Sequence, residues 1–357
     1  MKADPYIDYA GNLHVHSVYS DGAATVAEIA RVAHGAGLDF VIFNDHDYMA
    51  KRLPVEEEGF HDDLLVLVGL EIGERFHHYL ACNLRQWEPD ATLKPQEVID
   101  RVRKQGGFGF LAHPFEKGMP FLERSVAYTW NDLSVKGYTG ICIWNFSSRW
   151  KERVKTPFHG FLYLLFKTGL LKGPSAKTLC FWDQACQERR VAAVGGSDAH
   201  GSFLKWGAIR FTPLTYNYLL NSINVHVLLK KRPPRDLATA KAVVYEAMRE
   251  GRLYIAHEHL APARGFRFHY HLDQGGRIEM GQEESLEPGT LVIRTPGQGG
   301  KIRLLKDGQV VGEWKGREAL YRVSRAGVYR VEVYRRVFLF GWRPWIFSNP
   351  IYLRSSG

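Results

Sequence analysis

The stretch Asn12-Leu-His-Val-His-Ser-Val-Tyr-Ser-Asp-Gly22 indicates the first strand of the fold and the first side chains of a candidate site. His14 and His16 are two residues apart, so on an extended strand both project from one face, while Leu13 and Val15 project from the other. Two imidazoles side by side can share one cation. Asp21 follows in the loop and adds a carboxylate to the same region. The stretch therefore predicts a strand that ends in metal-binding side chains.

Further apolar runs follow this first run, 11–15, and helical patterns lie between them. Thr25 is a suitable N-cap for a helix through Ala36, Pro95 fits a first helical position, and Asp236 begins a helix that ends near Gly251. Alternation of strands and helices is typical of a parallel sheet covered by helices. The runs that we expect to be strands are 40–43, 64–70, 107–112, 140–144 and 191–194.

Most of these runs end in side chains that bind metals. In a barrel of parallel strands the carboxyl ends converge on one face, where such enzymes place their sites. One histidine on an apolar face is more often a core residue, but the same property at five strand ends indicates a metal site. Mixed His and carboxylate ligands suit Zn, Mn or Fe, and their number exceeds the need of one tetrahedral ion. The further strand ends read Asn44-Asp-His-Asp47, Gly69-Leu-Glu-Ile72, Ala112-His-Pro114 and Gly195-Gly-Ser-Asp-Ala-His200.

As an ordered set, these residues resemble the PHP (polymerase and histidinol phosphatase) superfamily of metal-dependent phosphoesterases. The resemblance covers about residues 10–215 and implies a distorted seven-stranded β/α barrel, similar to a TIM barrel, with a centre of two or three divalent metal ions. The C-terminal stretch Trp345-Ile-Phe-Ser-Asn-Pro-Ile-Tyr352 looks like part of the domain that follows the barrel in the CehA/McbA-like metallohydrolase branch. The matching motifs are His14-x-His16 with Ser20-Asp-Gly22, Asn44-Asp-His46, Gly69-Leu-Glu71, Ala112-His-Pro114 and Gly196-Ser-Asp-Ala-His200.

The resemblance also implies which side chains bind each metal. One ion is expected on His14, His16, Glu71 and Asp198. A second is expected on Asp21, His46 and His200, and Glu71 is expected to bridge to a further ion that His113 also binds. His78 resembles a family histidine, but His77 stands beside it, so a metal ligand and a surface histidine both remain open for His78. Many three-metal members carry another histidine where this chain has Trp144 and Asn145, so a complete third site is in doubt.

The resemblance predicts hydrolysis of a phosphoric monoester or diester by a water that two cations activate. His14, His16, Asp198 and His200 are expected at the reacting centre. Asp45 and Asp47 flank His46 and are candidates to orient imidazoles, with loop solvation as the alternative. Candidates for contacts with the substrate are Asn145 and the cations Arg149, Lys151, Arg153 and Lys205.

Two other functions are compatible with these residues. A metal-activated water also attacks acyl carbons, so a carboxylic ester or carbamate hydrolase is the first alternative. The second is a protein without catalysis, whose basic surface binds nucleic acid or a membrane. The aromatic residues of 337–347 are candidates for peripheral contact with a membrane, or for a sandwich core. We find no motif for specific nucleic-acid readout, although a short oligonucleotide remains a possible substrate beside a small phosphorylated molecule.

The length of 357 residues, with 45% hydrophobic residues, predicts two domains, 1–255 and 256–357, with 149–178 as an insertion or lid. The second domain is expected to be a small antiparallel β-sandwich, because after residue 256 short strands alternate with turns such as Asp307-Gly308. The net charge of +9 is concentrated in 149–177 and 301–357, which favours anionic partners.

The cysteines and the apolar segments give the expected compartment. The four cysteines contain no Cys-x-x-Cys pair and lie mostly in apolar surroundings, which indicates reduced thiols. The most apolar segment, 158–166, is too short to span a bilayer, which requires about 20 residues. The first residues do not resemble a signal peptide. We therefore expect a cytoplasmic protein that does not span a membrane.

Overall fold

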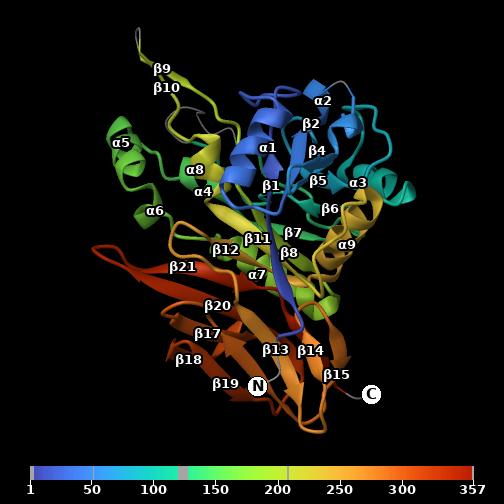
Figure 1. Cartoon of the computed structure of the whole chain (residues 1–357), viewed down its shortest axis with the longest axis vertical. Coiled ribbons are helices and arrows are strands. Elements are labelled where there is room, and N and C mark those ends of the chain that lie inside the picture. The colour runs from blue at the N-terminus through green and yellow to red at the C-terminus, as the bar shows by residue number, and fades with distance from the viewer. Residues whose placement is uncertain (1–3, 51, 120–127, 207–208, 356–357) are drawn as a thin grey trace.

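The computed structural model describes residues 4–50, 52–119, 128–206 and 209–355, and of 204–206 and 209–211 it describes the backbone alone. Its larger part is a mixed sheet covered by helices (Figure 1). β1 (Ile7–Val15), β2 (Phe40–His46) and β4 (Leu64–Ile72) run parallel, and so do β6 (Phe108–Leu111), β7 (Gly140–Asn145) and β8 (Ala192–Gly196). These six strands match the six apolar runs of the sequence, which confirms the mixed α/β class.

The expectation of a purely parallel sheet was wrong. β5 (Tyr79–Cys82) lies between β4 and β6 and is antiparallel to both, and β3 (Gly59–His61) adds a short antiparallel partner to β4. On the other side of β1, β11 (Ile223–Leu229) and β12 (Leu253–His257) are also antiparallel. β5 was not among the apolar runs expected to be strands. At the far end, a parallel bridge between Val15 and Ala199 brings the segment after β8 beside β1.

Helices follow the strands as their capping residues predict. Thr25 caps α1 (Val26–Gly35) by accepting a hydrogen bond from the Glu28 amide, and Pro95 begins α3 (Pro95–Lys104). Asp236 caps α9 (Leu237–Glu250), which ends at Gly251 with φ of 72°. The remaining helices are α2 (Asp47–Ala50), η1 (Val55–Glu57), α4 (Phe146–Lys151), α5 (Pro157–Leu165), α6 (Lys167–Leu170), α7 (Ala176–Glu188) and α8 (Tyr216–Leu220), and β9 (Leu204–Trp206) pairs with β10 (Ile209–Phe211).

The C-terminal strands form a second sheet and also extend the first. β14 (Arg277–Glu279), β13 (Arg267–Leu272), β16 (Gly289–Arg294) and β19 (Glu318–Arg322) make a four-stranded antiparallel sheet. The facing strands belong to the main sheet because β21 pairs with β12, so the sandwich is not a free-standing unit. These are β15 (Glu283–Ser285), β17 (Gly300–Lys306), β18 (Gln309–Gly316), β20 (Gly327–Val337), β21 (Gly341–Ser348) and β22 (Ile351–Arg354).

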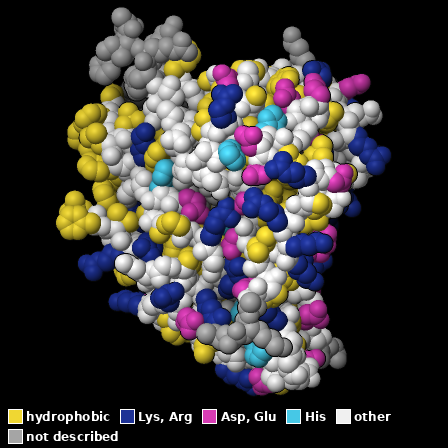
Figure 2. Space-filling view, in the orientation of Figure 1, with side chains coloured by type: hydrophobic (Ala, Val, Ile, Leu, Met, Phe, Trp, Pro, Cys, Tyr) yellow, Lys and Arg dark blue, Asp and Glu magenta, His cyan; other side chains and the backbone are white. Residues whose placement is uncertain are grey.

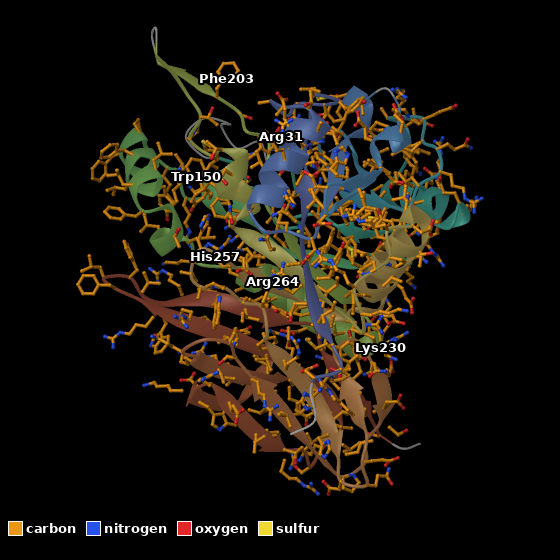
Figure 3. The ribbon with its side chains drawn as sticks, viewed as in Figure 1. Arg31, Trp150, Phe203, Lys230, His257 and Arg264 are labelled. Atoms are coloured by element: carbon orange, nitrogen blue, oxygen red, sulfur yellow. The ribbon has the colours of Figure 1, made fainter. Side chains whose placement is uncertain are left out.

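β12 contributes to both hydrophobic cores. Leu253 and Ile255 pack into the core of the helix-covered part, whereas Tyr254 and Ala256 pack between the C-terminal sheets. The predicted boundary between 255 and 256 thus falls inside this strand, which ends at His257 (Figure 3). The turn at Asp307-Gly308 joins β17 to β18 as predicted. Pro350, which has no amide hydrogen to donate, lies between β21 and β22.

Candidate metal centre

All nine side chains that the sequence nominated as ligands lie together where β1 and β8 meet. β1 and its following loop bring three of them, β2 and β4 bring one each, and the segments before β5, after β6 and after β8 bring the rest. Eight of the nine are buried or partly buried, and Asp21 is exposed. Their residues are His14, His16, Asp21, His46, Glu71, His78, His113, Asp198 and His200.

The Glu71 carboxylate occupies the middle of the cluster, and its side chain is 1% exposed. Its Oε2 lies 3.0 Å from His14 Nε2 and 3.2 Å from His46 Nδ1. Its Oε1 lies 2.7 Å from His78 Nδ1 and 3.1 Å from His113 Nε2. One carboxylate therefore faces imidazoles from several different chain segments.

Asp198 supplies a second carboxylate beside Glu71. Its Oδ1 lies 3.3 Å from both His14 Nε2 and His16 Nε2. Together with Glu71 these residues form a group of four buried side chains whose ligand atoms all lie within 4.8 Å of one another. This is the set that the family resemblance implied for one ion.

Asp21 joins a second group at the more open side of the cluster. Its Oδ2 lies 3.3 Å from His200 Nε2 and 3.8 Å from His46 Nε2, and its Oδ1 lies 3.4 Å from His16 Nδ1. His16 and His200 stack with ring centroids 4.0 Å apart. The second implied ligand set is thus also assembled, with His16 beside it.

His78 and its neighbour His77 have separate roles, which the sequence left open. His78 is 3% exposed, so it is not a surface histidine, and with His46 and Glu71 it forms a third group of ligand atoms within 4.8 Å. His77, with φ of 62°, turns away, and its Nε2 accepts hydrogen bonds from the amides of Asn131 and Asp132. His113 contacts the same Glu71 oxygen as His78.

The backbone at the cluster departs from regular strand geometry. His14 has φ of 64° and lies at a register shift between Leu13 and Val15, so an evenly extended strand does not set the His14/His16 pair, as the sequence had suggested. Asp198 has φ of 53°, and both residues are in the left-handed region that residues with a Cβ rarely adopt. Such outliers concentrate at functional sites, where the surroundings hold them in place.

The charges of the cluster depend on one another. Burial alone would raise the pKa of Glu71 and of Asp198, but the surrounding histidines, His14 first, hold both pKa values well below the usual range. Burial and the charge of His200 lower the pKa of His16 to about 3. Burial opposes protonation of His113 too, yet Glu116 and Glu71 raise its pKa to about 9. The Asp198 and Asp21 carboxylates likewise raise the pKa of His200 to about 9, against the effect of burial, so the cluster combines ionised carboxylates with both neutral and protonated imidazoles.

A Glu71 oxygen lies 3.0 to 3.4 Å from three of four buried ring nitrogens that nevertheless form no regular hydrogen bond. The four nitrogens are His14 Nε2, His16 Nε2, His46 Nδ1 and His78 Nε2. Buried polar atoms are normally paired, so each unpaired nitrogen here requires an explanation. Neutral imidazole nitrogens beside ionised carboxylates are the donor set that Zn, Mn and Fe accept. The described residues fit divalent metals.

Further side chains hold the cluster residues in place. Glu116, which sequence reasoning missed, has its Oε2 3.1 Å from His113 Nδ1, and its position three residues after that histidine was an available signal. Asn145 caps α4, accepting from the Ser148 amide, and donates to Asp198 Oδ2 at 3.2 Å. Asn145 is therefore both a helix cap and a partner of a cluster carboxylate.

Asp45 and Asp47 do not orient imidazoles, contrary to the sequence-based hypothesis. Asp45 accepts hydrogen bonds from the amide and hydroxyl of Ser17 and from the hydroxyl of Ser20, so it holds the loop that leads to Asp21. Asp47 accepts from the Gly73 amide and from the Trp87 indole. Asp45 points away from the cluster because successive residues of β2 face opposite sides, whereas Asp47 lies beyond that strand, at the start of α2.

Of the cations that the sequence nominated for substrate binding, Lys151 lies near the cluster and Arg149 is paired elsewhere. Lys151, on α4, is near enough to act on Asp198 and His200. Its charge is a minor cause that lowers the pKa of each, after the histidines at Asp198 and against Asp198 and Asp21 at His200, whose pKa is raised to about 9. Arg149 donates to the Gly173 carbonyl and pairs with Glu152, so a neighbouring carboxylate already balances its charge. Arg153 lies close to Arg149 and Arg343, as their lowered pKa values show, burial being the larger cause of each. Lys205 is in β9, and its side chain lies outside the described part.

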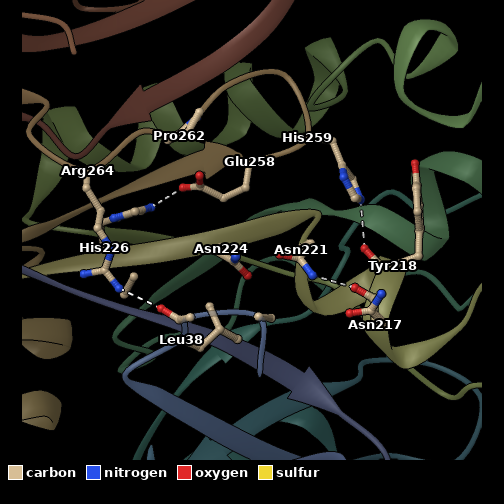
Figure 4. Close-up of a pocket in the computed structure, with 13 residues that line it drawn as sticks. Leu38, Asn217, Tyr218, Asn221, Asn224, His226, Glu258, His259, Pro262 and Arg264 are labelled. Atoms are coloured by element: carbon tan, nitrogen blue, oxygen red, sulfur yellow. Dashed lines mark hydrogen bonds and ion pairs between the residues drawn. The ribbon is translucent and has the colours of Figure 1, made fainter. Parts of the chain in front are cut away.

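A hollow of about 520 Å³ is lined by Ala10 of β1 and by none of the nine cluster residues (Figure 4). Its polar groups are largely occupied by one another. His226 Nε2 is 2.6 Å from Glu258, and Arg264 donates to the Gly37 carbonyl. Because this hollow gathers no group of metal-binding side chains among the described residues, the cluster is the stronger functional site.

Comparison with known proteins yields distant likenesses. No family model matches the chain. An uncharacterized protein of Methanocaldococcus jannaschii is 25% identical over 126 residues, which are 32% of this chain and 68% of that protein. A two-domain protein of Bacteroides vulgatus, containing a predicted PHP-like metal-dependent phosphoesterase, has a TM-score of 0.47 and 17% identity over 97% of this chain and 96% of its own.

A second solved structure is that of a proposed metal-dependent phosphoesterase of Bifidobacterium adolescentis. It has a TM-score of 0.31 and 18% identity, over 54% of this chain and 87% of its own. Because these identities and TM-scores are low, the function is inferred from the side chains of the cluster alone. Among the described residues, no helix has the length and apolar character needed to cross a membrane.

Proposed function

We propose that this protein hydrolyses phosphoric esters at a centre of two or three divalent metal ions. One observation carries the proposal: three overlapping groups of His, Asp and Glu side chains lie together, buried except for Asp21 and the partly buried His200, and Glu71 belongs to two of the groups. Buried charges that are this numerous are stable only when paired or bound to metal. We assign the chain to the PHP superfamily on its motifs, and propose that β1, β2 and β4 to β8, closed by the Val15–Ala199 bridge, form its distorted barrel.

Each ion has a proposed set of side chains. His14, His16, Glu71 and Asp198 would hold the first. Asp21, His46 and His200 would hold the second. Glu71, His78 and His113 would hold a third, for which Asn145 takes the place of a further histidine by fixing Asp198. Mn, Zn and Fe suit these donors. Bound there, divalent ions would neutralise phosphoryl oxygens and lower the pKa of a water toward neutrality.

The protein's own residues would bind and orient the ester. Lys151 places a positive charge near Asp198 and His200, which favours a substrate with a phosphate over a neutral ester. Tyr48 lies beside His46, with ring centroids 5.2 Å apart. Burial, Asp21 and Glu71 raise the pKa of Tyr48 to about 12, so its phenol stays protonated at neutral pH and can donate a hydrogen bond to the substrate.

A panel of three substrates tests the proposal. Manganese- or zinc-loaded protein is assayed with p-nitrophenyl phosphate, bis-p-nitrophenyl phosphate and a naphthyl carbamate. We expect turnover of at least one phosphate ester, loss of that turnover with a chelator, and a raised KM in Lys151→Gln. Turnover of the carbamate alone would instead identify an acyl hydrolase, and turnover of none of them by metal-loaded protein would oppose a hydrolase of these classes.

A further inference from the structure

Large apolar side chains are exposed on two segments far apart in sequence. Phe338 and Leu339, at the tip of the β20–β21 hairpin, are 85% and 82% exposed. Phe158, Phe161 and Leu165 of α5 are 66%, 58% and 59% exposed. We call these five residues, with Phe166, the apolar edge. Soluble proteins rarely expose such residues together unless the surface binds something.

The two segments are in contact, so they form one edge of the molecule. The rings of Phe166 and Phe340 are 5.6 Å apart, and the Arg343 guanidinium donates to the Gly169 carbonyl of α6. In Figure 1, α5, α6 and the β20–β21 hairpin project on the same side. Figure 2 shows hydrophobic side chains gathered along that side, with Lys and Arg next to them.

The hairpin tip has a residue that its backbone does not favour. Leu339 adopts φ of 65°, a conformation in which glycine or asparagine would be the ordinary choice for a turn. A leucine there adds conformational strain to the cost of exposing its side chain. Neither folding nor solubility accounts for that choice, whereas insertion of the side chain into an apolar phase does.

The surroundings of the apolar edge are uniformly basic. Residues 153–177 and 333–357 contain no Asp or Glu. Lys155, Lys172 and Arg336 are exposed in these segments. Burial, and then the charge of the nearby Arg153, lower the pKa of Arg343. Apolar and aromatic side chains next to Lys and Arg are the combination by which peripheral proteins bind anionic lipid surfaces.

We propose that the apolar edge docks this protein onto membranes that contain anionic lipid. Phe338, Leu339 and the exposed face of α5 enter the boundary between headgroups and acyl chains, while Lys155, Lys172 and Arg336 contact phosphate and carboxylate headgroups. α4 connects the metal centre at Asn145 to this edge through Lys151, so docking would place the centre near the lipid surface. The proposal does not depend on the reaction that the centre catalyses.

Vesicle co-sedimentation of the full chain tests the docking. Vesicles of phosphatidylcholine alone are compared with vesicles of phosphatidylcholine and phosphatidylserine. We expect binding to the anionic vesicles that weakens with salt. Removing both hairpin side chains in Phe338→Ser/Leu339→Ser should lower the partition coefficient at least ~10-fold. Lys155→Gln/Arg336→Gln should lower it roughly 25-fold, at about fivefold for each cation.

Leu320→Ser is the matched control. Leu320 is 66% exposed on β19 of the other sheet, and its removal should leave vesicle binding unchanged. Unchanged melting temperature and metal content of each variant establish that it is folded. The proposal is overturned if the folded wild-type protein does not bind anionic vesicles, or if the hairpin variant has the same partition coefficient as the wild type. It is equally overturned if the apolar edge instead holds two copies together, seen as a dimer that the hairpin variant converts to monomer.

Discussion

Replacing Glu71 by glutamine removes the charge at the centre of the cluster with little change in volume. The carboxylate faces five imidazoles, at 2.7 to 3.4 Å. Substitution of a residue that only hydrogen-bonds to a ligand lowers metal affinity about 10- to 100-fold. Glu71 is proposed to be a ligand itself, in two groups, so we expect metal affinity to fall about 100-fold or more. At 1.36 kcal/mol for each factor of ten, this is about 2.7 kcal/mol of binding free energy.

Competition with a chromogenic chelator measures this affinity, and elemental analysis after dialysis measures the metal that remains. Glu284→Gln, at an exposed position of β15, is the matched control and should retain the wild-type affinity. The glutamine variant should stay folded because the two side chains are close in size. Wild-type metal content and affinity in Glu71→Gln would refute a shared central ligand.

Three other predictions follow from neighbouring residues. His78→Ala should lower the metal content. His77→Ala should retain the metal and lower the free energy of unfolding by about 1–2 kcal/mol, because two amides lose their hydrogen-bond acceptor. Equal effects of the two variants on metal content would contradict these roles. Glu116→Gln should weaken metal binding about 10- to 100-fold, measured by chelator competition, and unchanged binding would remove Glu116 from the centre. Burial, and then the charge of His259, lower the pKa of His257 to about 3, so between pH 6 and 4 the unfolded chain takes up a proton that the folded chain does not. The unfolding free energy of wild type, measured in urea, should fall more steeply there than that of His257→Gln, by up to about 1.4 kcal/mol per pH unit, and parallel slopes would oppose this assignment.

Strands and helices with strong local signals were predictable from the sequence. Long apolar runs predicted β1, β2, β4 and β7, and the caps Thr25 and Asp236 predicted α1 and α9. β5 was missed although β6, which is equally short, was predicted. The sequence also did not predict that β12 contributes to two hydrophobic cores. An apolar run that is buried on both faces has the same pattern whether its two faces pack into one core or into two.

The cluster was more predictable than its surroundings. Ligand residues at strand ends converge because the sheet brings those ends together. The choice between His77 and His78 depended on a positive φ that no pattern reveals. Arg149 pairs with Glu152 three residues later, which is a local helical spacing, whereas its hydrogen bond to the Gly173 carbonyl depends on how α4 packs. Side chains whose partners lie outside the repeating pattern require the folded structure.

The number of metal ions per chain tests the central claim most directly. Elemental analysis of purified wild type is compared with the double variant His14→Ala/Asp198→Ala, which removes two side chains of the first group. We predict two or three equivalents of Mn, Zn or Fe in the wild type and a clear loss in the double variant. A wild-type protein that binds none of these metals, with all nine side chains intact, would contradict the account.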